Sequence, residues 1–175
     1  MPALTQGRLD WDLPHTQNVV RYVKEITSKY DYAKVEAAML VITAYLHDFG
    51  YLFFKDELKP GPTRGRAKAE HAKKSAEKWN EISTNNVFDF LSVAQKNRIH
   101  HLIEVHDSLS DLIDQDELLF MEADTLGALA TQSNIDRSSL LYRNYLQHTR
   151  DARVGRFISQ YSKQEAQKLL KKLEQ

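Results

Sequence analysis

The sequence contains no cysteine, which excludes disulfide bonds and thiolate metal sites and fits a reducing compartment, so we expect a cytoplasmic protein. It has only six glycines and four prolines in 175 residues, a scarcity that favours long helices with few tight turns. Neither charge sign is in excess, since 24 basic residues balance 24 acidic ones. No overall positive charge therefore draws the chain towards nucleic acid or an anionic membrane.

Long apolar runs and leader-like segments are also lacking. No apolar run approaches the roughly 20 residues that a helix needs to span a bilayer. The opening MPALTQGRLDWDLP has neither the basic nor the apolar region of a signal peptide. The hydrophobic content of 42% and charged content of 27% are ordinary for a globular protein. We expect one domain over residues 1–175 and no membrane partner.

The predicted fold class is all-α, a single-domain helical bundle of about six to seven helices. Apolar residues recur at spacings of three and four, as in Val19, Val20, Val23 and Ile26, which predicts one buried helix face. The predicted helices cover residues 14–28, 31–50, 67–82, 88–106 and 115–132, and two more lie in 136–175 with a break around 149–156. The segment 53–66, FFKDELKPGPTRGR, carries two prolines and two glycines and is predicted to be a loop.

The rest of the chain is organised around Met39–Tyr51, MLVITAYLHDFGY, in which an apolar helix runs into His47 and Asp48. Gly50 follows where a left-handed cap would end this helix. Burying a charged carboxylate there costs several kcal/mol unless a positive group compensates its charge, and a divalent metal would do so. The alternative is a structural histidine at a helix end beside a solvated aspartate.

Two further candidates lie on other helices. His15 occupies the first turn of the first helix, where the alternative is a solvent-exposed side chain. Asp124 stands inside the apolar run LLFMEADTLGALA and needs a partner, and Gly127 indicates a close approach of another helix. The alternative for Asp124 is a cap or a surface position.

The remaining histidines cannot all serve one site. His101 and His106 are five residues apart, and five residues turn a helix by about 140°. His100 and His101 are adjacent and point about 100° apart, so at most two of these three serve one site. The basic residues Lys55 and Arg64 lie in the predicted loop and belong either to a solvated segment or to a flap that meets substrate phosphates.

Three boxes occur in order along the chain: AYLHDFGY, HLIEVHD and MEADTLGAL. With these boxes the sequence resembles the HD superfamily of metal-dependent phosphohydrolases, whose signature is H…HD…D on a helical bundle, and in particular its small single-domain bacterial members. The resemblance covers about residues 15–129, and the helices in 136–175 add little to it. It implies His15, His47, Asp48 and Asp124 as metal ligands.

The resemblance also implies an activity and a set of working residues. It implies hydrolysis of a nucleotide or similar small phosphate ester by metal-activated water, with one divalent transition metal (Mn, Fe, Ni or Zn) or two. The implied catalytic residues are Asp48, His71 and His106, and the implied substrate-binding residues are Lys55, Arg64, Arg66 and His101. His71, His101 and His106 are expected either to hold the second metal or to face the phosphates.

Several alternatives stay open. The sequence does not separate a phosphomonoesterase from a phosphodiesterase or a nucleotide pyrophosphohydrolase, because loops make the selecting pocket. It lacks the GYP box of the cyclic-dinucleotide phosphodiesterases and the regulatory domains of stringent-nucleotide hydrolases. A non-catalytic module of the same fold that binds a nucleotide or a protein is the second hypothesis, and purely structural histidines are the third. The expected partner is a phosphorylated small molecule, and the Leu and Tyr residues of the last helices suggest a homodimer.

Overall fold

The computed structural model describes residues 11–30, 32–54, 65–131 and 139–174, and all regular structure in these ranges is helical. The main helices are α1 (Asp12–Lys29), α2 (Lys34–Leu46), α3 (Gly65–Ile82), α4 (Val93–Val105), α5 (Gln115–Thr131), α6 (Leu140–His148) and α7 (Gln160–Leu173). Shorter helical segments are η2 (Phe49–Phe54), η3 (Asn86–Phe88), η4 (Leu109–Asp111), η5 (Thr149–Arg153) and η6 (Val154–Arg156). The predicted all-α bundle and its number of helices are confirmed.

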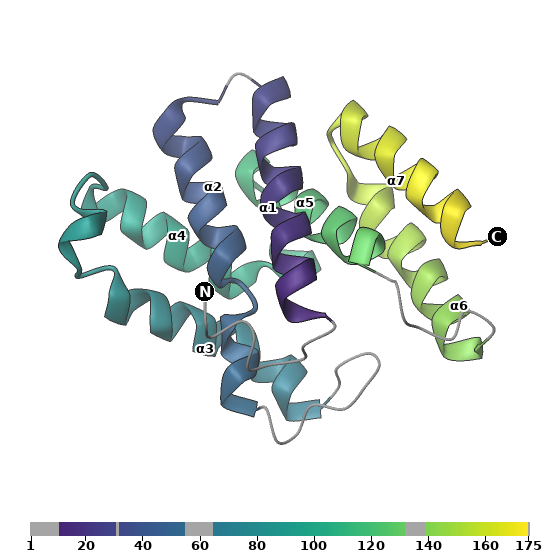
Figure 1. Ribbon diagram of the computed structural model, residues 1–175, viewed down its shortest axis with the longest axis horizontal. Helices are drawn as coiled ribbons and strands as arrows, with labels where there is room; N and C mark the ends of the chain where they lie inside the picture. The colour runs from purple at the N-terminus through teal and green to yellow at the C-terminus, as the bar shows by residue number, and fades with distance from the viewer. Residues whose placement is uncertain (1–10, 31, 55–64, 132–138, 175) are drawn as a thin grey trace.

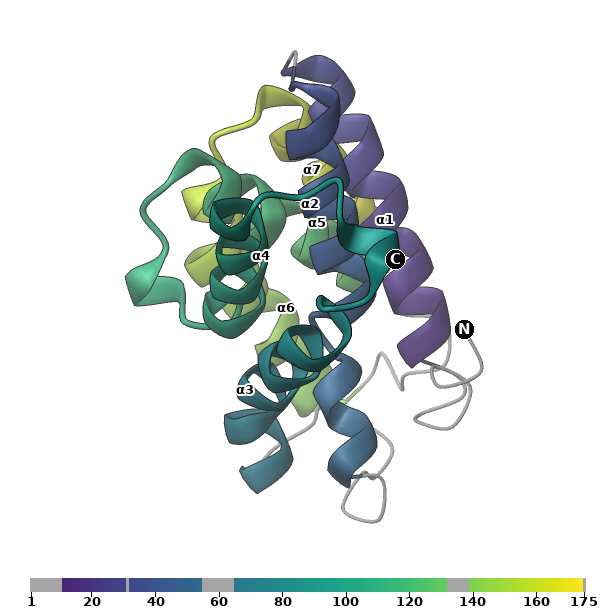
Figure 2. The same ribbon diagram turned by 90° about the vertical axis from the view of Figure 1, so that its left-hand side faces the viewer.

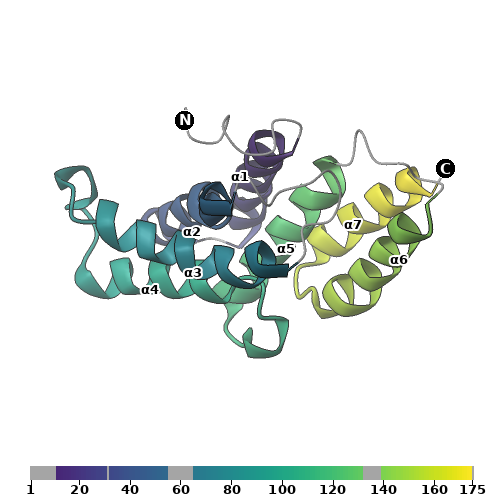
Figure 3. The ribbon, with the colours of Figure 1, turned by 90° about the horizontal axis from the view of Figure 1, so that it is seen from below.

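Three helices form the centre of the bundle. α1 and α2 lie side by side and antiparallel, and α5 packs across α1 (Figure 1). The α3–α4 pair lies on one flank, where α4 packs on α2, and it faces the viewer in Figure 2. α6 and α7 lie on the opposite flank, where α7 packs on α5 (Figure 3). This arrangement puts the start of α1 and the end of α2 at the same end of the molecule.

The core has two main apolar clusters, and α2 contributes to both. The larger contains the predicted face of α1, which is buried as expected, and it takes Leu40 from α2 and Leu126 from α5. This cluster also includes side chains of α4, α6 and α7, so the last two helices share the core with the first. The smaller joins Met39 of α2 to Trp79 of α3 and Ile103 of α4. Together they fix both flanks relative to α2.

By length and composition alone, the helical segment Lys34–Phe54 is long and apolar enough to span a membrane. This finding differs from the expectation that no apolar run approaches that length. The core helix of a soluble protein passes the same test. Here the segment packs against α1, α3, α4 and α5 and leads into His47 and Asp48. Burial in the bundle therefore accounts for its composition.

Helix α4 begins later than predicted. The expected start was Phe88, but Phe88 lies in η3, and α4 starts at Val93. The cause is a capping box: the Gln95 N–H donates to Ser92 Oγ at 3.2 Å, and the Ser92 N–H donates to Gln95 Oε1 at 2.8 Å. These bonds satisfy two backbone donors that a helix start would leave unpaired.

The predicted left-handed cap at Gly50 is wrong. α2 ends at Leu46, Gly50 lies inside η2, and its φ is not in the left-handed region. Glycine is needed there for another reason: a Cβ would lie 1.9 Å from the carbonyl oxygen of His71. The Gly50 N–H also donates to Ser75 Oγ at 2.7 Å. The missing side chain lets η2 pack directly on the backbone of α3.

The close approach predicted at Gly127 is confirmed. A Cβ on Gly127 would lie 2.5 Å from Val19 Cγ2 and 3.0 Å from the Val19 backbone nitrogen. Val19 is one helical turn after His15, and Gly127 is about one turn after Asp124. The tight crossing of α1 and α5 therefore brings His15 next to Asp124.

Glu117 stabilises the junction between α4 and α5. Its buried carboxylate accepts hydrogen bonds from the Ile113 N–H (2.8 Å), the Asp114 N–H (3.0 Å) and Arg98 Nη1 (2.9 Å). Burial alone would raise the pKa of Glu117, but these donors lower it to about 2. The folded state therefore favours the ionised carboxylate.

We expect Glu117→Gln to destabilise the fold by about 1–3 kcal/mol, because it removes a charge that several donors share. The stability that the ionised Glu117 contributes is fully present above its unfolded pKa of 4.5 and is lost as the pH falls from there towards 2. Urea unfolding at pH 7 and pH 3 measures both effects. Glu104→Gln, at an exposed position of α4, serves as the control. A variant as stable as wild type at pH 7 would contradict the prediction.

Candidate metal centre

Four histidines from four parts of the chain meet at one end of the central helices. His15 is in the first turn of α1, His47 directly follows α2, His71 lies within α3, and His106 directly follows α4. All four are buried, with exposed fractions between 0% and 3%. The exposed alternative considered for His15 is therefore wrong.

The predicted ligand quartet comes together as a first cluster, made of His15, His47, Asp48 and Asp124. His15 Nε2 lies 3.2 Å from His47 Nε2 and 3.1 Å from Asp124 Oδ1. Asp48 Oδ2 lies 3.6 Å from His15 Nε2 and 3.5 Å from His47 Nε2. Asp124 is buried, and it is neither a cap nor a surface residue.

The other oxygen of Asp48 faces a second cluster, made of Asp48, His71, His106 and Asp107. Asp48 Oδ1 lies 3.4 Å from His71 Nε2 and 3.6 Å from His106 Nε2, and these two nitrogens are 3.3 Å apart. Asp107 Oδ2 lies 3.2 Å from His71 Nε2 and 3.8 Å from His106 Nε2. Asp48 thus lies between two groups of potential ligands, one oxygen towards each.

The structure fixes which ring nitrogen is free in three of the histidines. The Nδ1 atoms of His47, His71 and His106 lie 3.0, 2.9 and 2.7 Å from the carbonyl oxygens of Ala44, Lys68 and Ile103, each three residues earlier in the chain. A carbonyl only accepts hydrogen bonds, so each Nδ1 carries the hydrogen. In the neutral ring, Nε2 then presents a lone pair to the cluster.

Lone pairs facing one another indicate a place for a cation. His71 and His106 direct two Nε2 lone pairs at each other across 3.3 Å, and the neighbouring oxygens of Asp48 and Asp107 are also acceptors. A positive ion placed among these atoms would be bound by the nitrogen lone pairs and carboxylate oxygens, which otherwise repel one another. Imidazole nitrogens fixed by a second hydrogen bond, together with carboxylates, are ligands typical of divalent transition metals. The donor set therefore fits a metal.

The electrostatics of the first cluster agree with this. Burial alone would lower the pKa of His47, but the carboxylates of Asp48 and Asp124 raise it to about 9. Burial would raise the pKa of each of these carboxyl groups. The surrounding histidines nevertheless hold the pKa of Asp48 well below its usual range, and Arg153, together with His15 and His47, does the same for Asp124. The site thus attracts positive charge, and a metal would replace a proton there.

Aromatic rings hold the imidazoles in place. Phe120 of α5 lies edge-on to His47 with ring centres 5.6 Å apart, and edge-on to His106 at 6.4 Å. Tyr51 of η2 stacks on His71 at 4.1 Å with the ring planes 3° apart. These contacts limit ring rotation, so the Nε2 atoms stay directed at the clusters.

His101 does not join this site, so its position does not suit the predicted contact with substrate. Its Nε2 lies 2.9 Å from Glu117 Oε1, and 46% of its side chain is exposed. His100 faces Glu104 instead. The five residues from His101 to His106 turn the two onto different sides of the helix, so of these three histidines only His106 reaches the centre.

The basic residues predicted to bind substrate are only partly described. Lys55 and Arg64 lie outside the described residues. Arg66 is an exposed residue in the first turn of α3, where its Nε donates to Glu70 Oε1 at 3.2 Å. Its neighbour Lys68 reaches the centre directly and pairs with Asp107.

Two residues of the centre were missed by sequence reasoning. Asp107 follows His106 as a second His–Asp pair inside the box HLIEVHD, and that repetition was the available signal. Arg153 lies in η5, a π-helical segment outside the region covered by the resemblance. Its Nη2 donates to Asp124 Oδ2 at 2.6 Å. Nothing local in the sequence marks that contact, since 29 residues separate the partners.

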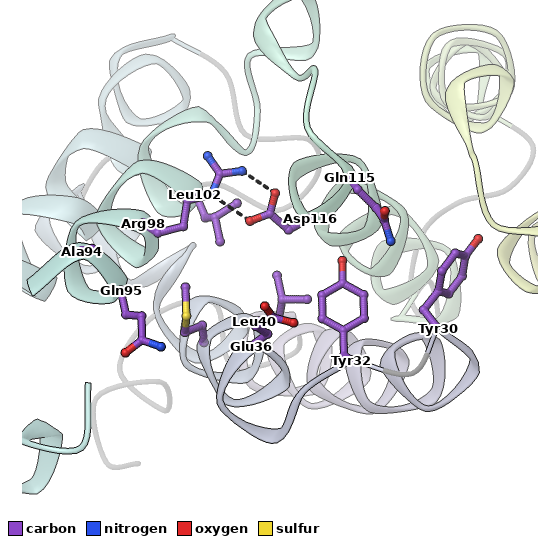
Figure 4. Close-up of a pocket in the computed structure, with 11 residues that line it drawn as sticks. Tyr30, Tyr32, Glu36, Leu40, Ala94, Gln95, Arg98, Leu102, Gln115 and Asp116 are labelled. Atoms are coloured by element: carbon purple, nitrogen blue, oxygen red, sulfur yellow. Dashed lines mark hydrogen bonds and ion pairs between the residues drawn. The ribbon is translucent and has the colours of Figure 1, made fainter. Parts of the chain in front are cut away.

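A cavity of about 540 Å³ lies elsewhere, between the end of α1, the start of α2, α4 and the start of α5 (Figure 4). Arg98 and Asp116 form an ion pair on one side of it, and Tyr32 lines the opposite side. Tyr30, also in its wall, is 15 residues beyond His15, or about 22 Å along the helix axis. The cavity is therefore separate from the metal centre.

In a comparison with protein families, the HD-CE family model matches residues 1–174. The matched region includes the C-terminal helices and Arg153 as well as the motif-bearing part of the chain. Comparisons with curated proteins and with solved structures gave no match.

Proposed function

The chain belongs to the HD-CE family, and on this basis we propose that it is a metal-dependent phosphohydrolase acting on a nucleotide or a similar small phosphate ester. The observation that carries the proposal is the position of Asp48, whose two oxygens face two pairs of buried imidazoles. A single structural histidine site would not need this doubled arrangement.

The residues divide into two groups of ligands. His15, His47, Asp48 and Asp124 would hold one metal, and Asp48, His71 and His106 would contribute to holding a second. A bound divalent metal would lower the pKa of a water molecule bound to it and would neutralise negative charge on the phosphoryl oxygens. The facing lone pairs of His71 and His106 favour the second-metal role over direct contact of these histidines with phosphate.

The chain's own cations suit a phosphate-bearing substrate. Lys68 lies beside the second cluster. Arg66 is half a turn earlier on α3, where its exposed side chain points to another side of the helix. The preceding segment carries Lys55 and Arg64, the other predicted substrate-binding residues. Guanidinium and ammonium groups recognise phosphate oxygens, and Arg does so with two parallel hydrogen bonds. We propose that this side of the centre receives the phosphate.

Hydrolysis forms a bond from a water oxygen to phosphorus, breaks the ester or anhydride P–O bond, and moves a proton from water to the leaving oxygen. Asp48 lies between both clusters and close to all four histidines, so its ionised carboxylate would accept a hydrogen bond from that water and orient it. Phe120 and Tyr51 pack against the imidazoles of His47 and His71 and would keep them oriented towards the clusters.

The test is product release from mono-, di- and triphosphates of ribo- and deoxynucleosides, with Mn²⁺ and with EDTA. We expect Mn²⁺-dependent release of phosphate or pyrophosphate by wild type and by the control His101→Ala, whose side chain lies outside the clusters. His47→Ala and Asp124→Ala should lose both turnover and bound metal. Full metal content and activity in these two variants would overturn the proposal.

The alternative, a non-catalytic binding module, predicts a different result. Metal-replete protein would then bind a nucleotide tightly and release no product. Structural histidines alone predict no bound transition metal, which elemental analysis after loading with Mn²⁺ and desalting would reveal.

A further inference from the structure

Arg153 contacts one aspartate of the first cluster and one aspartate of the second, although it belongs to neither cluster. Its Nη2 donates to Asp124 Oδ2 at 2.6 Å, and its Nη1 lies 3.4 Å from Asp107 Oδ1. Its Nε donates to Thr125 Oγ1 at 2.7 Å, which fixes the plane of the guanidinium group. One side chain thus engages a carboxylate of each cluster.

In both carboxylates, Arg153 takes the oxygen that the nearest histidine leaves free. Asp124 presents Oδ1 to His15 and Oδ2 to Arg153. Asp107 presents Oδ2 to His71 and Oδ1 to Arg153. The two clusters therefore share a plan: each has two histidines, one oxygen of the shared Asp48, and one aspartate whose other oxygen contacts Arg153. They differ in that Asp107 Oδ2 also pairs with Lys68.

The charges support a positioning role. Arg153 is a largely covered cation, with 15% of its side chain exposed, and it faces the buried carboxylate of Asp124 and the partly buried carboxylate of Asp107. An arginine holds two carboxylates in fixed directions because its donors lie in one plane. Its segment η5 is a π-helix, a form that commonly occurs at functional sites.

We infer that Asp107 is the terminal ligand of the second metal, as Asp124 is of the first, and that Arg153 positions both aspartates and so links the two metal sites. This inference rests on the proposed function, because it presupposes that the clusters bind metal. It predicts that loss of the Arg153 side chain weakens both sites, although Arg153 is far from every proposed ligand in the sequence.

The experiment is calorimetric titration of metal-free protein with Mn²⁺, which resolves the affinity and stoichiometry of each site without any substrate. Removing a residue that orients metal ligands typically costs 10–100-fold in affinity, so we expect about that loss at both sites in Arg153→Gln. Arg153→Lys should recover part of it, because it restores the charge but not the planar fork. Asp107→Asn should lose the second site and keep the first.

The control is Arg150→Gln, in the same segment, where Arg150 pairs with the half-exposed Glu174. It should bind two metals with wild-type affinity. Wild-type affinities at both sites in Arg153→Gln, or weakening of one site alone, would overturn the inference while leaving the proposed function intact. Two unchanged sites in Asp107→Asn would also overturn it. A wild-type chain that binds no metal would overturn the proposed function and the inference together.

Discussion

Replacing Asp48 by asparagine is expected to empty both metal sites at once. One carboxylate oxygen lies 3.5 Å from His47 Nε2 in the first cluster, and the other lies 3.4 Å from His71 Nε2 in the second. An amide keeps the shape of the side chain but offers a single neutral oxygen, so at best one cluster retains a weakened ligand. We therefore expect Asp48→Asn to have no detectable turnover and little bound metal.

Metal content and thermal stability measure this loss independently of activity. A ligand that binds only the folded state at 100 times its Kd stabilises it by about 2.7 kcal/mol. Wild-type protein should therefore show a large rise in Tm on addition of Mn²⁺, and Asp48→Asn should show almost none. Asp151→Asn, at an exposed carboxylate bonded to Gln147, is the control and should respond like wild type. Two bound metals in Asp48→Asn would contradict this account of the centre.

Replacing Gly50 by alanine is expected to give the largest loss of stability among conservative changes in η2. The new methyl group would lie 1.9 Å from the His71 carbonyl oxygen and 2.9 Å from the Ser75 backbone nitrogen. Both are backbone atoms of a packed helix, so relief requires η2 and α3 to move apart. Overpacking usually costs about 1–3 kcal/mol, and a clash with backbone should reach at least the upper end of that range.

The same change should also reach the second cluster, because the displaced backbone is that of His71 itself. We expect weaker Mn²⁺ binding there, with the first cluster less affected. Gly155→Ala is the matched control, since its methyl group would lie 3.9 Å from the Arg150 carbonyl oxygen, an ordinary contact. Urea unfolding followed by metal titration tests both effects. An unfolding midpoint equal to that of wild type in Gly50→Ala would show that the interface is not as tight as described.

Much of the fold could be predicted because it depends on local pattern. The apolar spacing on α1 identified a buried face, and the position of Asp124 within an apolar run identified a candidate ligand; both are confirmed as buried. Gly127 correctly indicated a close helix crossing, because a glycine costs helix stability and is favoured inside an apolar helix where another backbone needs the space. The start of α4 was misplaced because Phe88 extends the apolar pattern of the helix, whereas the Ser92–Gln95 capping box sets its boundary.

The parts that could not be predicted depend on contacts between distant segments. Gly50 fits a helix cap by its position in the sequence, and only the packing of η2 on α3 reveals its other purpose. Arg153 was one of several arginines in a basic region, and its partner Asp124 is on a different helix. Asp107 carried a weak signal, but its value as a ligand depends on α3 bringing His71 within 3.2 Å. The spacing of residues along the chain does not predict these contacts between distant segments.

The backbone bonds of the histidines bear on how this centre could change over evolutionary time. The Nδ1 atoms of His47, His71 and His106 each lie close to a carbonyl oxygen one helical turn earlier. In many metal sites the equivalent acceptor is a side chain, which a single substitution can delete. A main-chain carbonyl persists whatever residue occupies that position, provided that the helix remains. Homologous chains could therefore diverge widely around these histidines and still keep the ring nitrogens directed at the two clusters.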